Sequence, residues 1–91
     1  MLGNMNFPFE QKILNGKLLR TFSIDVESDE LKWHQDQNDR KVTIIESGDW
    51  QFQMDDSLPI KLQNGQEFFI PKLVWHRVIK GKKDLVVCIE E

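Results

Sequence analysis

Hydrophobic and polar residues alternate along most of the chain, and clusters of turn-forming residues separate the alternating stretches. In residues 50–54, apolar side chains alternate with glutamines, which gives the period of two expected for a half-buried β-strand. Residues 58–62 follow the same period, and so do residues 18–26, where Arg20 interrupts the apolar positions. Each stretch is therefore predicted to form a strand with one buried and one solvated face.

Two other stretches, residues 42–45 and 85–89, are apolar at both odd and even positions. This pattern predicts central strands that are covered on both faces. No stretch carries a helical stripe of three turns; residues 9–19 could hold one turn of helix, but an Asn-Gly pair would end it. Turn signals recur at gaps of about 8 to 12 residues, which is typical of a β-sandwich or barrel. The pattern predicts an all-β protein with a single domain over residues 1–91.

The composition supports a folded chain that has little material for a core. Hydrophobic residues make up 40% of the sequence and include six Phe and three Trp, which is enough for folding. A domain of 91 residues buries a smaller fraction of its surface than a larger domain does. Association with a second copy is therefore a natural way for this chain to bury more apolar area.

The charge pattern and the cysteine content exclude several classes of partner. The 12 basic and 15 acidic residues give a net charge of −3, and the basic residues are scattered, so nucleic-acid binding is not expected. The lone Cys88 rules out an internal disulfide and favours a reducing compartment. The chain begins with no signal-peptide pattern, and no apolar stretch reaches the roughly 18 residues of a membrane span. We expect a cytoplasmic protein without a membrane or nucleic-acid partner.

The most specific pattern in the sequence runs from Gly65 to His76. It reads as a turn, a short apolar strand stopped by Pro71, a tight corner, and a second strand that opens with His76. Its spacing resembles the second motif of the cupin family, G-x5-P-x-G-x2-H, with Leu73 in the place of the second glycine.

An upstream segment resembles the first cupin motif, G-x5-H-x-H-x3-4-E-x6-G. The matching residues are Trp33-His34-Gln35-Asp36, Arg40-Lys41 and Gly48. The combined resemblance covers about residues 31–90. It implies a small cupin-type double-stranded β-helix, an antiparallel β-barrel of two packed sheets whose functional residues lie in the barrel mouth.

In the cupin family, three histidines and one glutamate from the two motifs hold a divalent metal such as iron, manganese, nickel or zinc. Imidazole and carboxylate groups are suitable ligands for these metals. The positions of the three histidines are taken here, in order, by His34, Asp36 and His76. The glutamate position falls on Arg40 or Lys41, and counting back six residues from Gly48 favours Lys41. The resemblance thus implies a degenerate metal site with a cation in the place of an acidic ligand.

The resemblance also implies that His34, Asp36 and His76 meet at the barrel mouth, with Arg40 or Lys41 close by. A cation there would repel a metal ion and lower the pKa of both imidazoles, while Asp36 would act in the opposite direction. We therefore predict that no cofactor is bound. The alternative is a divalent metal (Zn, Ni, Fe or Mn) held by His34, Asp36 and His76.

Two functions from different classes follow, and both stay open. The first is a stand-alone cupin that binds a small anionic or carbohydrate-like molecule, with Arg40 or Lys41 as the anion anchor. The remaining contacts to that ligand would come from His34, Asp36 and His76. The second is a metal-dependent cupin enzyme of the isomerase or oxygenase type. Epimerases of this fold that use a tyrosine and a histidine are excluded, because the chain contains no tyrosine.

A tryptophan precedes each of the two histidines, at Trp33 and Trp75. If the histidines point into the barrel, strand alternation sends both indoles to the outer surface. Tryptophan is enriched at the centres of protein interfaces. We therefore predict a homodimer with at least one of these two indoles at or near its interface.

Overall fold

The structure is a computed structural model that describes residues 7–28 and 31–91, and these residues form eight β-strands. The strands are β1 (Glu10–Leu14), β2 (Lys17–Phe22), β3 (Arg40–Glu46), β4 (Gln51–Met54), β5 (Ile60–Lys61), β6 (Glu67–Ile70), β7 (His76–Ile79) and β8 (Leu85–Glu90). Within this part of the chain, no helix has the length and apolar character that crossing a bilayer requires.

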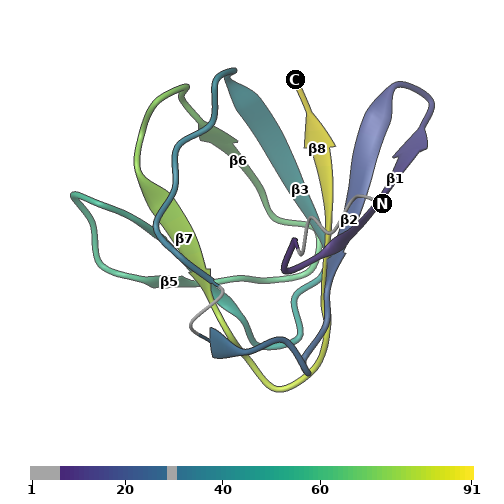
Figure 1. Ribbon diagram of the computed structural model, residues 1–91, viewed down its shortest axis with the longest axis vertical. Coiled ribbons are helices and arrows are strands. Elements are labelled where there is room, and N and C mark those ends of the chain that lie inside the picture. The colour runs from purple at the N-terminus through teal and green to yellow at the C-terminus, as the bar shows by residue number, and fades with distance from the viewer. Residues whose placement is uncertain (1–6, 29–30) are drawn as a thin grey trace, which may run out of the picture.

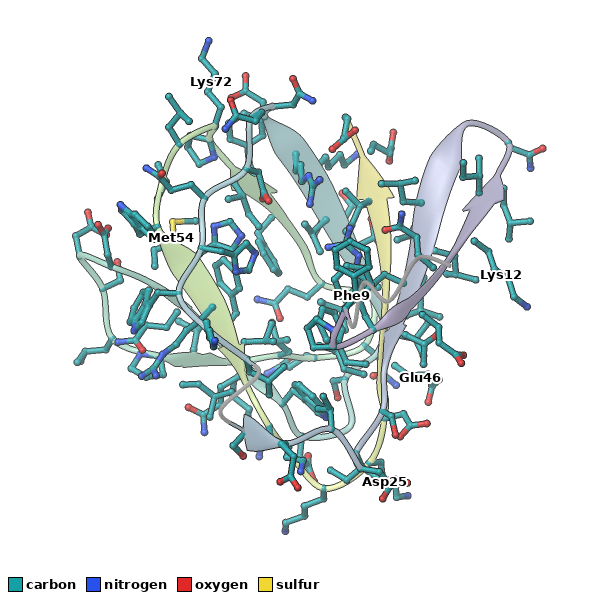
Figure 2. The ribbon with its side chains drawn as sticks, viewed as in Figure 1. Phe9, Lys12, Asp25, Glu46, Met54 and Lys72 are labelled. Carbon is teal, nitrogen blue, oxygen red and sulfur yellow. The ribbon has the colours of Figure 1, made fainter. Side chains whose placement is uncertain are left out.

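The strands form two antiparallel sheets that face each other, as Figure 1 shows. The larger sheet has the strand order β1-β2-β8-β3-β6, and the smaller one has the order β5-β4-β7. In Figure 1 the sheets meet where the chain passes from β7 to β8, and they diverge toward the end at which the C-terminus lies. In Figure 2, Lys72 lies at the diverging end and Asp25 near the opposite end. The predicted all-β, two-sheet architecture is confirmed.

The core lies between the sheets and uses alternate residues of each strand. In β8, Leu85, Val87 and Ile89 are buried, while the side chains between them are partly exposed. Strands β3 and β8 are central, as predicted, but their outer faces are not covered, and Ile45 is 44% exposed. The prediction of burial on both faces is wrong because a second layer packs on one side only. The buried apolar residues are Phe22, Leu31, Val42, Ile44, Trp50, Phe52, Leu62, Ile70, Leu85, Val87 and Ile89.

Residues 9–19 form most of a β-hairpin instead of a turn of helix. Asn15 and Gly16, between β1 and β2, have φ angles of 51° and 77°. Positive φ at both central residues defines a type I′ turn, whose twist matches that of the flanking antiparallel strands. The Asn-Gly pair therefore reverses the chain between two strands.

Two predicted strands are shorter than their alternation suggested. Strand β2 ends at Phe22, where a turn begins in which the N–H of Val26 donates to the carbonyl of Ser23 at 3.1 Å. In residues 58–62 only two residues pair, and Leu58 is 83% exposed. The proline at position 59 lacks the N–H that a strand ladder requires, which accounts for the short pairing.

The end at which the sheets meet is packed tightly around Trp50, which is fully buried and donates its indole N–H to the carbonyl of Lys83. The carbonyl of Gly48 accepts the N–H groups of Lys82 and Lys83 at 2.7 and 3.1 Å. A Cβ atom on Gly81 would lie 2.3 Å from that same oxygen, so this position has room only for glycine. We call this region, formed by residues 48–50 and 81–83, the closed end.

Candidate functional site

His34 and His76 lie side by side across an isolated antiparallel bridge. The N–H of His34 donates to the carbonyl of His76 at 3.0 Å, and the return bond measures 2.9 Å. Residues paired in this way project their side chains on the same face, and the two ring centroids are 4.3 Å apart. His76 is buried, whereas the side chain of His34 is half exposed. The bridge thus brings the two sequence motifs together.

The corner between β6 and β7 fixes the segment that carries Asp36. Leu73 adopts a left-handed conformation with φ of 64°, a conformation that favours glycine, which is the residue that the motif has at this position. Its N–H donates to the carbonyl of Asp36 at 2.8 Å, and the N–H of Lys72 donates to Oδ1 of Asp39 at 2.8 Å. These two bonds hold the loop before β3 against the corner.

Each histidine is held by a backbone carbonyl two residues upstream. Nδ1 of His34 lies 3.0 Å from the oxygen of Lys32, and Nδ1 of His76 lies 2.9 Å from the oxygen of Val74. Because a carbonyl oxygen only accepts hydrogen bonds, each Nδ1 carries the hydrogen. In the neutral ring this leaves the lone pair on Nε2, on the side that faces Asp36.

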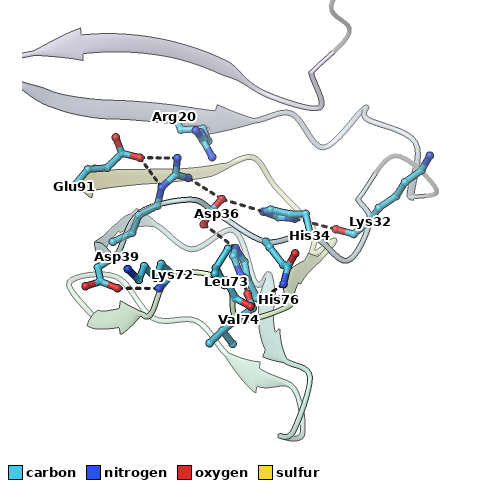
Figure 3. Close-up of polar contacts among 12 residues, drawn as sticks. Arg20, Lys32, His34, Asp36, Asp39, Lys72, Leu73, Val74, His76 and Glu91 are labelled. Atoms are coloured by element: carbon cyan, nitrogen blue, oxygen red, sulfur yellow. Dashed lines mark hydrogen bonds and ion pairs between the residues drawn. The ribbon is translucent and has the colours of Figure 1, made fainter.

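Asp36 completes a compact group, which Figure 3 shows. Its Oδ2 lies 3.2 Å from Nε2 of His76, and its Oδ1 lies 4.0 Å from Nε2 of His34. One potential ligand atom from each of the three residues lies within 4.8 Å of the others. We call His34, Asp36 and His76 the His–Asp–His cluster, and the end of the barrel that holds it the mouth. Strand β7 begins at the mouth and runs to the closed end.

The inner oxygen of Asp36 lacks a hydrogen-bond donor among the described residues, although the side chain is only 9% exposed. Nε2 of His76 is close enough to donate, but it carries a hydrogen only when the ring is protonated, because in the neutral ring with the hydrogen on Nδ1 this atom presents a lone pair. Two lone pairs that face each other in a buried site repel, and a buried polar atom without a partner is unfavourable. A proton or a metal cation between the two atoms would satisfy both.

Burial and neighbouring charges set the protonation of the cluster. Burial alone would raise the pKa of Asp36, but the contact with His76 and the charge of Arg40 outweigh it, so this pKa lies below its usual value. Burial lowers the pKa of His34; the carbonyl of Lys32 and the charge of Asp36 oppose this, and His76 and Arg20 reinforce it. At pH 7 the cluster therefore contains an ionised Asp36 and a neutral His34.

Of the two cations predicted near the cluster, the structure brings only Arg40 to it. Nη1 of Arg40 lies 3.3 Å from Oδ1 of Asp36, and its Nε and Nη2 both donate to Oε2 of Glu91, at 2.8 and 2.7 Å. Lys41 projects to the opposite face of β3 and forms an exposed ion pair with Glu67 at 3.6 Å. Lys41 is therefore not part of the mouth.

The count back from Gly48, which favoured Lys41, is wrong by one residue. The pairing of β3 with β8 shifts between Ile44 and Glu46, where a β-bulge places an extra residue in β3. Seven residues instead of six thus separate Gly48 from the inward-facing Arg40. A bulge depends on pairing with a distant strand, so the motif spacing alone did not reveal it.

Arg20 is a second cation at the mouth that the sequence interpretation did not assign to the site. It lies on β2 opposite Val87, on the inner face of the larger sheet. Burial and the charge of Arg40 lower its pKa to about 10. The signal that could have identified it is its place in residues 18–26, where it is the one charged residue at the apolar parity.

Two adjoining hollows open around the cluster. An inner cavity of about 60 Å³ lies between the sheets, and an outer cleft of about 350 Å³ lies between the mouth and residues 7–9. The inner volume has room for more than one water molecule, since about 10–15 Å³ of such space holds one. Six residues line both hollows: Arg20, Phe22, His34, Asp36, Arg40 and Val78.

No known family model and no curated protein matches this chain. Solved structures do match. A cupin-2 domain containing protein from Shewanella frigidimarina NCIMB 400 superimposes with a TM-score of 0.63 at 24% sequence identity, over 97% of this chain and 83% of that one.

Two further matches are parts of longer chains. A chain from the crystal structures of the DMSP lyases RdDddP and RnDddQII gives a TM-score of 0.68 at 12% identity, over 80% of this chain and 35% of that one. Fe(II)-HppE with the alternative substrate (S)-1-HPP gives 0.63 at 15% identity, over 80% and 40%. At these identities the matches establish the fold alone, and this chain has the cupin fold.

Proposed function

We propose that this protein binds a divalent metal ion through the His–Asp–His cluster and uses it on a small molecule in the outer cleft. The observation that carries the proposal is the buried Oδ2 of Asp36, which faces Nε2 of His76 at 3.2 Å without a hydrogen-bond donor among the described residues. A divalent cation would accept both lone pairs at once, and the partly exposed His34 would supply a third ligand.

The donor set fits a first-row transition metal. Two imidazoles and one carboxylate form the ligand set of many non-haem Fe(II) sites, and they leave positions open for substrate. Metal-binding histidines usually donate their other ring N–H to a carbonyl or carboxylate, which orients the ring. Both His34 and His76 already have such a partner, in the carbonyls of Lys32 and Val74. The proposal therefore adopts the metal-bound alternative over the metal-free state predicted from the sequence.

Arg40 supports this arrangement instead of blocking it. It contacts Oδ1 of Asp36 and leaves Oδ2 free of any donor among the described residues. Two of its N–H groups bind Glu91, whose carboxylate offsets its charge. A metal-binding carboxylate is usually hydrogen-bonded through its other oxygen, and Arg40 would have that role for Asp36.

The chemistry would be of the isomerase or oxygenase type. A bound metal would act as a Lewis acid toward an oxygen atom of the small molecule. The chain would exclude bulk water with the apolar side chains of the inner cavity, which include Phe52, Phe68 and Ile70. One of the matched structures is an Fe(II) form of HppE, which supports a metal on this fold.

A second candidate function is a metal-free module that binds a small anionic or carbohydrate-like molecule. The contact of 3.3 Å between Arg40 and Asp36 favours it, because this ion pair already neutralises the carboxylate. In that case a proton on Nε2 of His76 would satisfy the inner oxygen of Asp36.

Metal titration of chelator-treated protein by calorimetry, with Zn²⁺ and Ni²⁺, tests the proposal. We expect binding of one ion per chain. Replacing His34 with Ala or Asp36 with Asn should weaken binding at least about 100-fold, because each removes a direct ligand. As a matched control, Asp56→Asn alters an exposed carboxylate outside the cluster and should leave binding unchanged.

Visible absorption of the Co²⁺ form gives an independent measurement, because its bands report the ligand set. Spectra that are the same in the unsubstituted protein and in His34→Ala would place the metal elsewhere. If the unsubstituted protein binds no ion more tightly than Asp36→Asn does, the metal proposal is wrong and the metal-free module takes its place.

A further inference from the structure

Arg20 is a half-buried cation without an acidic partner among the described residues. Its Nε and Nη2 donate to Oε1 of Gln11 at 2.9 and 2.6 Å, and its guanidinium carbon lies 3.8 Å from the centre of the Phe9 ring. Both partners are neutral. Within the part of the chain that the structure describes, no carboxylate lies within 4.0 Å of its nitrogen atoms. Three of the five N–H groups of the guanidinium are thus left for another acceptor.

A second guanidinium lies in the same cleft. Arg20 and Arg40 both line the outer cleft and the inner cavity. Figure 3 shows Arg20 near Glu91, the residue to which Arg40 is bound. The two side chains come from β2 and β3, which are separated in the sheet by β8. Burial and the charge of Arg40 both oppose the charged form of Arg20, as its lowered pKa indicates. The carboxylates of Asp36 and Glu91 act in the opposite direction on this pKa. A bound anion would add to their stabilisation of the charged form of Arg20.

Apart from Lys32, His34 and Asp36, the rest of the cleft is apolar. Phe9 and Phe22 stack edge to face at 5.4 Å, and Leu31 and Val78 complete the wall beside the two arginines. The volume of about 350 Å³ falls near the lower end of the range for small-molecule sites. The cleft therefore suits a small molecule with one anionic group and a short apolar body.

We propose that Arg20 and Arg40 form an anion-binding subsite that holds the carboxylate or phosphate-type group of this small molecule, with its apolar part against Phe9 and Phe22. Planar guanidinium groups bind such anions with two parallel hydrogen bonds. The ligand would then extend toward the His–Asp–His cluster. The inference rests on the proposed function, since it names the substrate class of the same site.

Anion titration of the metal-stripped, ¹⁵N-labelled protein by NMR tests this subsite. The probes are inorganic phosphate and butyrate at constant ionic strength. The Nε–H signals of Arg20 and Arg40 are suitable reporters, because each N–H is held in a hydrogen bond. We expect both signals to shift together and to saturate with at least one of the two anions. The relative affinity of phosphate and butyrate identifies the anion class.

Arg77 offers a matched control. It binds Oε1 of Gln53 through the same two nitrogens, at 3.0 and 2.9 Å, and lies over the ring of Trp33, but it lines neither hollow. Arg20→Gln should weaken anion binding at least about tenfold, while Arg77→Gln should not change it. Arg20→Lys keeps the charge but loses the paired N–H donors of the guanidinium, so we expect an intermediate loss of anion affinity. This variant replaces Arg20→Gln in the test if Arg20→Gln does not fold.

The failure of this inference and the failure of the metal site have different signatures. Equal anion affinities for Arg20→Gln and the unsubstituted protein, or shifts spread equally over Arg77, would overturn the subsite. Zn²⁺ titration of Arg20→Gln without anion should still show one bound ion per chain, with an affinity no lower than that of the unsubstituted protein. The substitution removes a positive charge that acts on His34 but removes no metal ligand. Anion binding that depends on Arg20 in a protein without Zn²⁺ affinity would support the subsite and reject the metal.

Discussion

The two ends of the barrel differ in what occupies their buried space. At the closed end the backbone itself fills the space, with Gly81 against Gly48 and the fully buried Trp50 bound to the chain between β7 and β8. At the mouth the buried space holds polar groups, including Oδ2 of Asp36, which has no donor among the described residues.

Strands β3 and β7 begin at the mouth and run to the closed end, so the same elements serve both regions. Complete packing at one end makes a small domain stable. At the mouth, a buried polar atom without a hydrogen-bond donor among the described residues remains available to bind a ligand. The comparison predicts that substitutions at the closed end change stability first, and that substitutions at the mouth change binding first.

Gly81→Ala should give the largest effect on stability. The new Cβ would lie within 2.5 Å of backbone atoms of Gly48 and Asp49, which cannot move without disturbing the closed end. We expect the free energy of unfolding in urea to fall by about 3 kcal/mol or more.

Gly65→Ala is the control for Gly81→Ala. Gly65 has a positive φ of 84°, and a methyl group added there would have no other atom within 4 Å, so the variant reports backbone strain without a clash. A loss of about 1 kcal/mol is expected there. Equal losses for the two variants would show that the closed end is not tightly packed.

Asp36→Asn should separate binding from stability at the mouth. The amide oxygen can accept from Arg40, and the amide nitrogen can donate to Nε2 of His76, which Asp36 faces at 3.2 Å. At pH 8 we expect the free energy of unfolding to stay within about 1 kcal/mol of the unsubstituted value, although metal binding is lost. A loss of several kcal/mol in urea unfolding would mean that the mouth is a structural ion-pair network and not a binding site.

The predicted homodimer concerns the outer rim of the mouth. Trp33 and Trp75 are 37% and 45% exposed in the single chain, and Arg77 covers part of Trp33. Light scattering should give twice the 10.8 kDa mass of the chain at micromolar concentration. Trp75→Glu should weaken association at least about tenfold, and Ile13→Glu on the distant β1 strand should not. A monomeric unsubstituted protein would show that the mouth faces solvent directly.

Leu73→Gly should give the smallest change in the free energy of unfolding, and we expect this change to be stabilising. Leu73 has φ of 64° and is 51% exposed, so glycine would relieve strain and lose little packing. We expect a gain of about 0.5–1 kcal/mol in urea unfolding. Leu58→Gly is the control, since Leu58 is exposed but is not among the residues with positive φ, and it should give no gain. A loss in Leu73→Gly would show that the leucine side chain stabilises the corner.

The local features of the fold could be read from the sequence because they depend on neighbouring residues. Alternation in residues 50–54 predicted β4, and the proline before the corner correctly ended β6. The same local logic failed for Leu58, whose exposure depends on what packs beside it. It also failed for the outer face of β3, because apolar residues at both odd and even positions do not show whether a second layer covers that face.

The sequence by itself carried the resemblance of its two motifs to the cupin family, and this resemblance implied that His34, Asp36 and His76 meet. In the structure, one potential ligand atom from each of the three lies within 4.8 Å of the others. Only the tertiary structure decided which cations join them. The bulge in β3 turned Arg40 inward and Lys41 outward, and the pairing of β2 with β8 brought Arg20 to the same cleft. Both outcomes depend on register between strands far apart in the chain, and a shift of one residue reverses the face on which every side chain lies.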